Sequence, residues 1–289
     1  MGAHHARVFS RCQGTRLTGV FDTNAAASGR VAAAVDTQPF ASLESVFEGS
    51  DLVVVATPID THRSIAQRAL LAGRAVLVEK PLCASATEAH TLVTLAERAR
   101  RHLFVGHSER FNPVLVALLD ALRGDRVLEA QLSRLAPPRG RALDHGVCIN
   151  LAVHDVDLAA LLFGTPLRLV RAEGHDGAAM LHLACKHGRP ATVHASQVAA
   201  ERVRRLRVVT ERHVFEGDLV GGTLLRDGDP IEVSGTEALL AQARAVLSAL
   251  QGLDTPCASG IDGAAAVALV EEAALWLLER PKRATGVSP

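Results

Sequence analysis

Buried strands alternate with helices over residues 51–107, and this alternation constrains the fold more than any other feature of the sequence. The runs DLVVVAT (51–57), RAVLVEK (74–80) and HLFVGH (102–107) are apolar almost throughout, as is typical of strands covered on both faces. Helical patterns occupy residues 61–73 and 85–101 between them. The order strand, helix, strand, helix, strand predicts right-handed crossovers and a parallel sheet of the doubly wound α/β Rossmann type.

The residues before this unit predict that the first strand of the sheet is missing. TRLTGVFD (15–22) is a β-rich run, and AHHARVFSR after Gly2 is a helical pattern. A dinucleotide site needs a strand and a G-x-G-x-x-G turn before that helix, whereas Gly2 can supply only the last glycine. We expect the first strand to be missing, because the sequence begins downstream of the true start or because the enzyme is degraded. Intact downstream motifs favour the first reason, and residues 17–21 and 52–56 should flank a gap or pair directly.

A second domain is predicted after His107. The sequence indicates a helix, a half-buried strand and a further helix over residues 112–124, 126–135 and 147–164. Short strands separated by Gly, Asp and Pro turns follow, and two helices close the chain. This pattern predicts an α+β domain with an open, mostly antiparallel sheet. The domains are placed at residues 1–110 and 111–289, with the last helix packing back on the first domain.

One face of this second sheet is predicted to form an interface. The helices of the domain should cover one face, and apolar side chains on the other face should seek a partner. The side chains expected there are Leu181, Leu183 and Val193. We therefore expect a homodimer, or a dimer of dimers, through this face.

Composition excludes several partners and sites. With 48% hydrophobic residues, the 289-residue chain can bury the core of one large or two ordinary domains. Lys plus Arg and Asp plus Glu balance at 31 each, which argues against nucleic acid or an anionic membrane as partner. No apolar run reaches the roughly 20 residues of a membrane span. Five scattered cysteines without a Cys-x-x-Cys pair indicate reduced thiols in a cytoplasmic protein, and no metal site is predicted.

Polar groups end the predicted strands at the edge where such sheets bind ligands. They are Asp22, Thr57 with Pro58, and Glu79 with Lys80. Asp22 follows Gly2 by 20 residues, the spacing of an acid that binds the adenosine ribose hydroxyls. Such an acid favours NAD over NADP, whose 2′-phosphate it repels. An Asp at a strand end is also a common turn former or helix cap, and a Glu-Lys-Pro triplet can simply terminate a strand.

A polar stripe interrupts the otherwise apolar helix at 147–164. Asn150, His154 and Asp157 have the spacing i, i+4, i+7 and should share one face. Buried polar groups of this kind must be hydrogen-bonded or open to a cleft. His154 is suited to accept a proton near neutral pH. The alternatives are a core histidine satisfied by a neighbour, and a solvated edge at Asp155 and Asp157.

Three segments together resemble the Gfo/Idh/MocA oxidoreductases, which include glucose–fructose oxidoreductase and inositol 2-dehydrogenase. They are VVVATPIDTHRSIAQRALLAGRAVLVEKPLCAS, VGHSERFNP and VCINLAVHDVDL, in that order. The resemblance runs from residue 2 to about residue 280, and the Glu-Lys-Pro triplet combined with the His-Asp-x-Asp helix makes it fairly specific. Within the family, the chain is most similar to the branch that acts on nucleotide-sugars.

The resemblance implies an NAD(P)-dependent enzyme that transfers a hydride between nicotinamide and a hydroxyl carbon of a sugar, nucleotide-sugar or cyclitol. Lys80 would bind the reacting hydroxyl, Pro81 would follow a cis peptide bond, and His154 would be the general acid and base. Asn150 stands where the family usually has Asp, which affects rate and substrate choice rather than reaction class. The implied cofactor-binding residues are Gly2, Asp22, Ala56, Thr57, Pro58, His62, Glu79 and Lys80. The implied substrate-binding residues are His107, Arg110, Asn112 and Asp157.

Two other functions remain compatible with these features. A non-catalytic sensor of sugars or nucleotides would suit the incomplete front and Asn150. A redox-neutral enzyme would use NAD transiently to eliminate or hydrolyse a glycosidic bond. A tightly co-purifying NAD distinguishes the enzyme from the sensor, and analysis of the products identifies the redox-neutral reaction.

Overall fold

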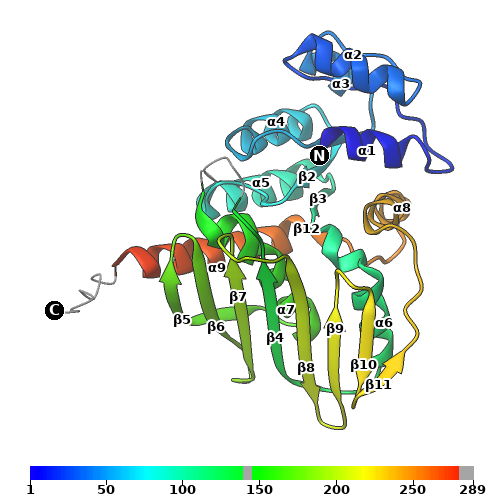
Figure 1. Cartoon of the computed structure of the whole chain (residues 1–289). Helices are drawn as coiled ribbons and strands as arrows, with labels where there is room; N and C mark the ends of the chain where they lie inside the picture. The colour runs from blue at the N-terminus through cyan, green and yellow to red at the C-terminus, as the bar shows by residue number, and fades with distance from the viewer. Residues whose placement is uncertain (139–144, 280–289) are drawn as a thin grey trace.

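Two sheets organise the computed structural model, which describes residues 1–138 and 145–279 (Figure 1). The smaller sheet has the order β1-β2-β3-β12. Its strands are β1 (Leu52–Val55), β2 (Ala75–Glu79), β3 (Leu103–Gly106) and β12 (Ala258–Ser259). The first three run parallel, and β12 pairs antiparallel with β3. The crossovers contain α4 (Ile59–Leu71) and α5 (Ala86–Ala99). The parallel sheet predicted from the alternating pattern is therefore confirmed.

Helices cover both faces of this smaller sheet, because its strands alternate between two apolar clusters. Val76 and Val78 pack with residues of α4 and α5. Leu77, which points to the opposite face, packs with residues of α1 (Gly2–Phe9) and α8 (Ala238–Leu250). Figure 1 shows the same layering, with the blue α1 and the orange α8 on the side away from α5.

The strand predicted at residues 15–22 is wrong. Only an isolated parallel bridge joins Val20 to Pro39, with backbone hydrogen bonds of 3.0 and 2.8 Å to Gln38 and Phe40. The run pairs with the loop between α2 (Ala25–Ala34) and α3 (Leu43–Glu48) instead of joining the sheet. Of the two arrangements expected, a gap beside β1 or direct pairing with it, direct pairing is absent from the described residues. Leu17 packs in the same apolar cluster as Leu52, and the hydroxyls of Thr18 and Ser50 lie 3.2 Å apart, so side chains connect the run to the edge strand β1.

The larger sheet has eight strands in the order β11-β10-β9-β8-β4-β7-β6-β5. They are β4 (Val127–Leu135), β5 (Leu167–His175), β6 (Ala178–Cys185), β7 (Pro190–Ser196), β8 (Val203–Thr210), β9 (Val214–Asp218), β10 (Thr223–Arg226) and β11 (Asp229–Ile231). Neighbouring strands are antiparallel except for β4 and β7, which run parallel. The predicted open, mostly antiparallel sheet is confirmed, although β11 and β12 were not anticipated from the sequence.

Within residues 1–138 and 145–279, helices cover one face of the larger sheet and not the other. They are α6 (Pro113–Ala121), α7 (Val153–Phe163) and α9 (Gly260–Glu279) (Figure 1). Leu181, Leu183 and Val193 are at most 1% exposed and pack on this covered face. The prediction that they project from the uncovered face is wrong, because neighbouring residues of a strand point to opposite faces. The uncovered face carries their neighbours, such as His182 and Thr192, which are paired across β6 and β7.

Two features connect the sheets. A 3-10 turn, η1 (Ser108–Phe111), follows β3 and precedes α6. The long helix α9 contacts α5 and β3 of the smaller sheet as well as α7 and β5 of the larger one. The C-terminal part of the chain thus returns to the first sheet through both β12 and α9. None of the described helices is long and apolar enough to cross a membrane.

Candidate active site

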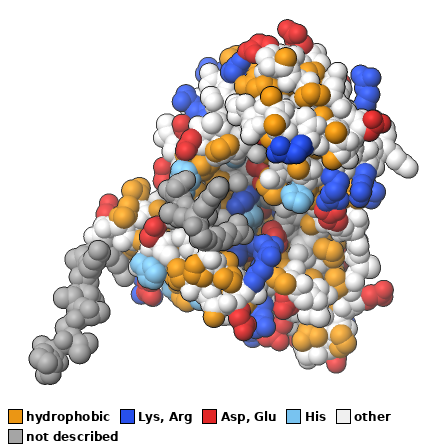
Figure 2. Space-filling view, turned by 45° about the horizontal axis from the view of Figure 1, so that its top comes forward, with side chains coloured by type: hydrophobic (Ala, Val, Ile, Leu, Met, Phe, Trp, Pro, Cys, Tyr) orange, Lys and Arg blue, Asp and Glu red, His pale blue; other side chains and the backbone are white. Residues whose placement is uncertain are grey.

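The carboxyl ends of β1 and β2 open into a hollow of about 440 Å³. Figure 2 shows the molecular surface hollowed between its upper and lower parts, with Lys or Arg and His side chains on the walls. The lining residues are Met1, Ala56, Thr57, Pro58, Ile59, His62, Glu79, Lys80, Pro81, His145 and Asn150. Most of the predicted cofactor residues therefore share one hollow, together with Asn150 of the predicted polar stripe Asn150, His154 and Asp157.

Lys80 connects the Glu-Lys-Pro triplet directly to the segment that contains Asn150. Its Nζ donates a hydrogen bond of 3.1 Å to the backbone oxygen of Asn150. Asn150 lies in a π-helical turn, Cys148–Ala152, that leads into α7. The wider turn departs from the single regular helix predicted for residues 147–164, and turns of this kind are frequent at functional sites. The Lys80–Pro81 peptide bond is cis, as the family resemblance implied.

Glu79 is buried at the end of β2 and is held by a residue that the sequence analysis missed. His5 Nε2, on α1, lies 2.6 Å from Glu79 Oε1, and the backbone N–H of Lys80 donates to Oε2 at 3.2 Å. Burial alone would raise the pKa of Glu79, but the hydrogen bond and charge of His5, with the charge of Lys80, hold it below its ordinary value. No local pattern distinguishes His5 from its neighbour His4 in the sequence.

His62 turns its ring nitrogens toward backbone oxygens. Nδ1 faces the carbonyl of Pro81 and Nε2 faces the carbonyl of Thr57, both at 2.9 Å. The ring is 2% exposed and bridges the loops that follow β1 and β2. His62 therefore fixes the distance between two walls of the hollow.

Two histidines lie near Lys80. His154, in the first turn of α7, is half-buried, and its Nδ1 is buried without a hydrogen-bond partner among the described residues. Burial, followed by the charges of Lys80 and Arg134, lowers the pKa of His154 well below its ordinary value. His107 follows β3 and is 1% exposed, with its ring centroid 6.5 Å from that of His154. The lowered pKa favours the neutral form of His154, which has a lone pair available for a proton.

The other predicted substrate residues are engaged with protein groups. Arg110 Nε and Nη2 donate to the two oxygens of Asp157 at 2.8 and 2.5 Å, and both side chains are buried. This bidentate pair locks η1 to α7. Asn112 Oδ1 accepts the N–H of Val114 as the N-cap of α6, and Nδ2 donates to the carbonyl of Leu219 at 3.1 Å.

A second ion-pair cluster, absent from the sequence predictions, lies beside His154. Arg134 Nε and Nη2 of β4 donate to the two oxygens of Asp155, each at 2.9 Å. Arg204 Nη1 of β8 donates to Glu109 Oε1 at 2.5 Å. Asp155 is therefore buried and paired, not part of a solvated edge. The partners are distant in sequence, so only the folded sheet brings them together.

Asp22 and Gly2 lie outside the lining of the hollow. Asp22 is exposed, and its Oδ1 accepts the backbone N–H of Asn24 at 2.8 Å, just before α2. It thus forms the turn that the sequence allowed as an alternative. Gly2 is the first residue of α1, whose preceding residue Met1 does line the hollow.

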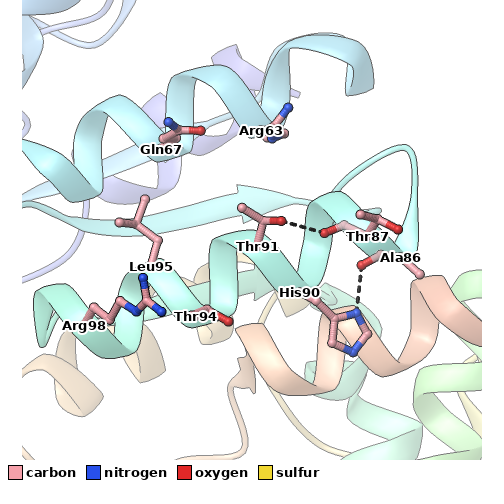
Figure 3. A pocket seen from close by; sticks show the side chains of 9 residues that line it. All are labelled: Arg63, Gln67, Ala86, Thr87, His90, Thr91, Thr94, Leu95 and Arg98. Carbon is pink, nitrogen blue, oxygen red and sulfur yellow. Dashed lines mark hydrogen bonds between the residues drawn. The ribbon is translucent and has the colours of Figure 1, made fainter.

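A larger hollow, of about 680 Å³, lies away from these residues (Figure 3). It is an open groove between α4 and α5, with Arg63 on one side and Arg98 on the other. The polar side chains on α5 bind their own helix: His90 Nδ1 lies 2.7 Å from the carbonyl of Ala86, and Thr91 donates to that of Thr87. The groove lacks the convergent polar atoms of the site at the strand ends.

Comparisons with known proteins agree with this arrangement. Residues 1–107 match the Gfo/Idh/MocA family, described as an oxidoreductase family with an NAD-binding Rossmann fold. UDP-N-acetylglucosamine 3-dehydrogenase of Acidithiobacillus ferrooxidans is 35% identical over 231 residues, which cover 78% of this chain and 72% of that protein. An inositol 2-dehydrogenase of Rhizobium meliloti is 27% identical over 57% of this chain and 52% of its own length.

The solved structures give the same assignment. UDP-N-acetylglucosamine 3-dehydrogenase GnnA from Acidithiobacillus ferrooxidans superimposes with a TM-score of 0.86 at 28% identity, covering 95% of this chain and 93% of that one. These findings confirm the predicted fold class, family and class of enzyme. The chain belongs to the Gfo/Idh/MocA family, the oxidoreductases with an NAD-binding Rossmann fold.

Proposed function

We propose that this chain is an NAD-dependent dehydrogenase that oxidises a ring hydroxyl of a nucleotide-sugar. The observation that carries the proposal is the 3.1 Å hydrogen bond from Lys80 Nζ to the carbonyl of Asn150. It brings a strand-end amino group beside the helix that bears His154. The similarity to UDP-N-acetylglucosamine 3-dehydrogenase supports the substrate class. Residues 1–110 would bind the cofactor and residues 111–289 the substrate, with β12 and α9 crossing back.

The residues around the hollow fit the nicotinamide end of a dinucleotide. Ala56, Pro58 and Ile59 offer an apolar wall for the flat ring. Thr57 and Lys80 offer hydrogen-bonding groups for the amide and the ribose. The N-terminal ends of α1 and α4 reach the same hollow through Met1 and Ile59. Helix N-termini favour anionic groups such as a pyrophosphate.

The side chains divide the chemistry between them. A bound NAD would supply the acceptor for the hydride of the carbon that bears the reacting hydroxyl. Lys80 Nζ donates a hydrogen bond to the hydroxyl oxygen and stabilises the negative charge that develops there. His154 removes the hydroxyl proton at Nε2, because Nδ1 is buried. The side-chain amide of Asn150 binds a neighbouring sugar hydroxyl, but it cannot share a proton with His154.

The proposal specifies NAD rather than NADP. Asp22 is exposed at the end of the 15–22 run, and only its Oδ1 is used in the turn with Asn24. The remaining carboxylate oxygen can accept hydrogen bonds from ribose hydroxyls. The same charge would repel a 2′-phosphate, which supports NAD as the preferred cofactor.

The test is a direct assay of hydride transfer. The purified protein is mixed with NAD⁺ and UDP-N-acetylglucosamine, with myo-inositol as the comparison substrate, and formation of NADH is followed by absorbance. Lys80→Met and His154→Asn should each reduce turnover by at least about 100-fold. Lys186→Met and His187→Asn alter exposed residues in the β6–β7 turn and serve as matched controls.

Other outcomes of this assay are equally informative. Turnover at the wild-type level in both Lys80→Met and His154→Asn would overturn the assigned roles. Tight NAD binding without turnover on any sugar would support the sensor, and a changed sugar with no net NADH would support the redox-neutral reaction. Preference for myo-inositol would reject the nucleotide-sugar but retain the dehydrogenase.

The proposal also includes a homodimer through the uncovered face of the larger sheet. Met180, His182, Thr192 and His194 lie there as neighbours across β6 and β7, and all are half-buried. The buried Nε2 of His182 has no hydrogen-bond partner among the described residues. This surface is more polar than the sequence suggested. Light scattering at micromolar concentration tests the proposal, and a strict monomer would overturn it.

A further inference from the structure

Two histidines from different parts of the fold meet beside Lys80: His107 is buried, and His154 is half-buried with its Nδ1 buried. His107 follows β3, and His154 begins α7. Their ring centroids are 6.5 Å apart and their planes are at 82°, so one ring presents its edge to the other. Neither ring is needed to fill an apolar core, because leucine or phenylalanine would fill the same volume without burying polar atoms. The pairing therefore needs a chemical explanation.

Three ring nitrogens of this pair are buried without a partner. Both nitrogens of His107 and Nδ1 of His154 make no hydrogen bond to the described residues, and neither does Nδ2 of the nearby Asn150. Each unsatisfied buried group costs about 1–3 kcal/mol, so native proteins rarely leave one unpaired. A small polar site with several such groups is where internal water is ordinarily held. These nitrogens are hydrogen-bonding groups of the kind that an internal water requires.

Asp157 determines which ring nitrogen of His107 carries the proton. Arg110 donates to both of its oxygens, which fixes the carboxylate as an acceptor of hydrogen bonds. His107 Nδ1 lies 3.8 Å from Asp157 Oδ2, slightly beyond hydrogen-bond range. A proton on Nδ1 is attracted by the carboxylate, so Nε2 of His107 is left as the acceptor.

We infer that His107 is a positioning residue that orients His154 through an internal water. It links His154 to the carboxylate of Asp157 through a chain of hydrogen bonds. This inference rests on the proposed function of His154. Nδ1–H of His107 points to Asp157, and Nε2 of His107 accepts a hydrogen from the water. The water oxygen accepts Nδ1–H of His154, which leaves Nε2 of His154 as the bare nitrogen that faces the substrate. No covalent bond other than the substrate O–H is broken, and its proton stays on Nε2.

The arrangement compensates for Asn150. A carboxylate at that position would fix the tautomer of His154 directly, whereas an amide cannot stabilise the imidazolium as strongly. The charged groups that dominate at His154 are bases: Lys80 after β2, Arg134 on β4 and Arg204 on β8. Around His107 they are Asp157 on α7, Arg110 on η1, Lys80 and Glu79. Asp155 and Glu109, beside His154, are already paired with Arg134 and Arg204. Asp157 and Glu79 are the acids that act on His107, so His107 is placed to link His154 to Asp157.

The electrostatics agree with a neutral His107. Burial lowers its pKa below the ordinary value, although the charge of Asp157 acts in the opposite direction. A neutral imidazole has one donor and one acceptor, as a link between a carboxylate and a water requires. A protonated ring would offer two donors and could not accept from the water.

The test compares three variants under the assay described above. His107→Phe keeps the ring but removes both nitrogens, and kcat should fall roughly 10- to 100-fold with little change in KM. His107→Gln retains a donor and an acceptor and should restore part of kcat. His102→Phe changes an exposed histidine that precedes β3 and should leave kcat unchanged. The acid limb of the pH profile should also move in His107→Phe, which a purely structural residue would not cause.

A double variant separates this inference from the proposed function. In a His154→Asn background, His107→Phe should have no further effect on kcat, because the two residues act as one unit. Effects that multiply independently would overturn the inference. If His154→Asn abolishes turnover while His107→Phe retains the wild-type rate and pH profile, only the inference fails. Wild-type turnover in His154→Asn itself would reject the proposed function. If His107→Phe does not fold, the pH profile of His107→Gln decides.

Discussion

His5 Nε2 and Glu79 Oε1 lie 2.6 Å apart, and both side chains are buried. The contact joins α1 to the last residue of β2, one position before Lys80. It therefore determines where the strand ends and how the amino group of Lys80 enters the hollow. The same pair explains why a carboxylate can remain charged at this depth.

His5→Leu should show that Glu79 depends on His5 to remain charged. Without His5, the carboxylate of Glu79 is left buried and weakly compensated, so the free energy of unfolding at neutral pH should fall by about 3–5 kcal/mol. The wild-type pKa of Glu79 lies below 4.5, so its contribution to stability is present above that pH and is lost as the pH falls through the lowered value. Denaturant unfolding at several pH values measures both effects.

The control for His5 is its exposed neighbour. His4→Leu should leave stability and its pH dependence almost unchanged. A similar small effect in His5→Leu would contradict the idea that the pair holds Glu79 in its charged form.

The pair of Arg134 and Asp155 should behave as a coupled unit. Both side chains are at most 3% exposed, so Asp155→Leu leaves a buried guanidinium whose remaining acidic contact is the longer one of 3.6 Å from Nη1 to Glu109 Oε1. Breaking a buried pair in this way typically costs about 3–5 kcal/mol, whereas removing both charges costs much less. Arg134→Met combined with Asp155→Leu should therefore be more stable than Asp155→Leu alone, as measured by chemical unfolding. The exposed pair Asp120 and Arg123 provides a control that should barely affect stability.

Local patterns predicted the elements that build the site. The buried strands at residues 52–55, 75–79 and 103–106 were visible as apolar runs, because each is covered on both faces. Parallel strands end at one edge of a sheet, so the segments after β1 and β2 could be placed together without knowing any contact. This reasoning brought Thr57 and Lys80 to the same hollow.

Contacts between distant residues could not be predicted in the same way. His5 and Glu79 are 74 residues apart, and no periodicity relates them. Residues 15–22 have the composition of a strand, but composition does not indicate which partner is available. In the π-helical turn before α7, the helix widens without a change of residue type. The inward direction of Leu181 depended on strand parity, which a shift by one residue reverses.

The pH dependence of the reaction should reflect the unusual base. Because the pKa of His154 is well below 6.5, this residue stays neutral and active as a base at pH values where an ordinary histidine is charged. The acid limb of kcat/KM for sugar oxidation should therefore lie well below pH 6.5. Because the folded protein keeps His154 neutral, the free energy of unfolding is undiminished above the pKa of the unfolded state and declines as the pH falls below 6.5. A pH–rate profile with its acid limb at or above that value would contradict this electrostatic picture.

Lys80 should account for part of this lowering. After burial, its charge is the largest cause of the shift in His154. Lys80→Met should therefore raise the pKa of His154 toward its ordinary value, as followed by NMR titration of the imidazole. Lys186→Met removes an equal charge from an exposed turn and should leave the titration unchanged. An unaltered titration in Lys80→Met would mean that burial alone sets the pKa.

Asp22 should set the preference for NAD. Asp22→Asn removes the charge but keeps an oxygen that can accept the N–H of Asn24, so the turn before α2 is preserved. The ratio of kcat/KM for NADP⁺ to that for NAD⁺ should rise by about 10-fold or more, because juxtaposed like charges cost several kcal/mol and 1.4 kcal/mol corresponds to tenfold. Asp254→Asn removes an exposed charge from the loop after α8 and should leave the ratio unchanged. An unchanged ratio in Asp22→Asn would mean that the adenosine ribose is bound elsewhere and that Asp22 serves only the turn.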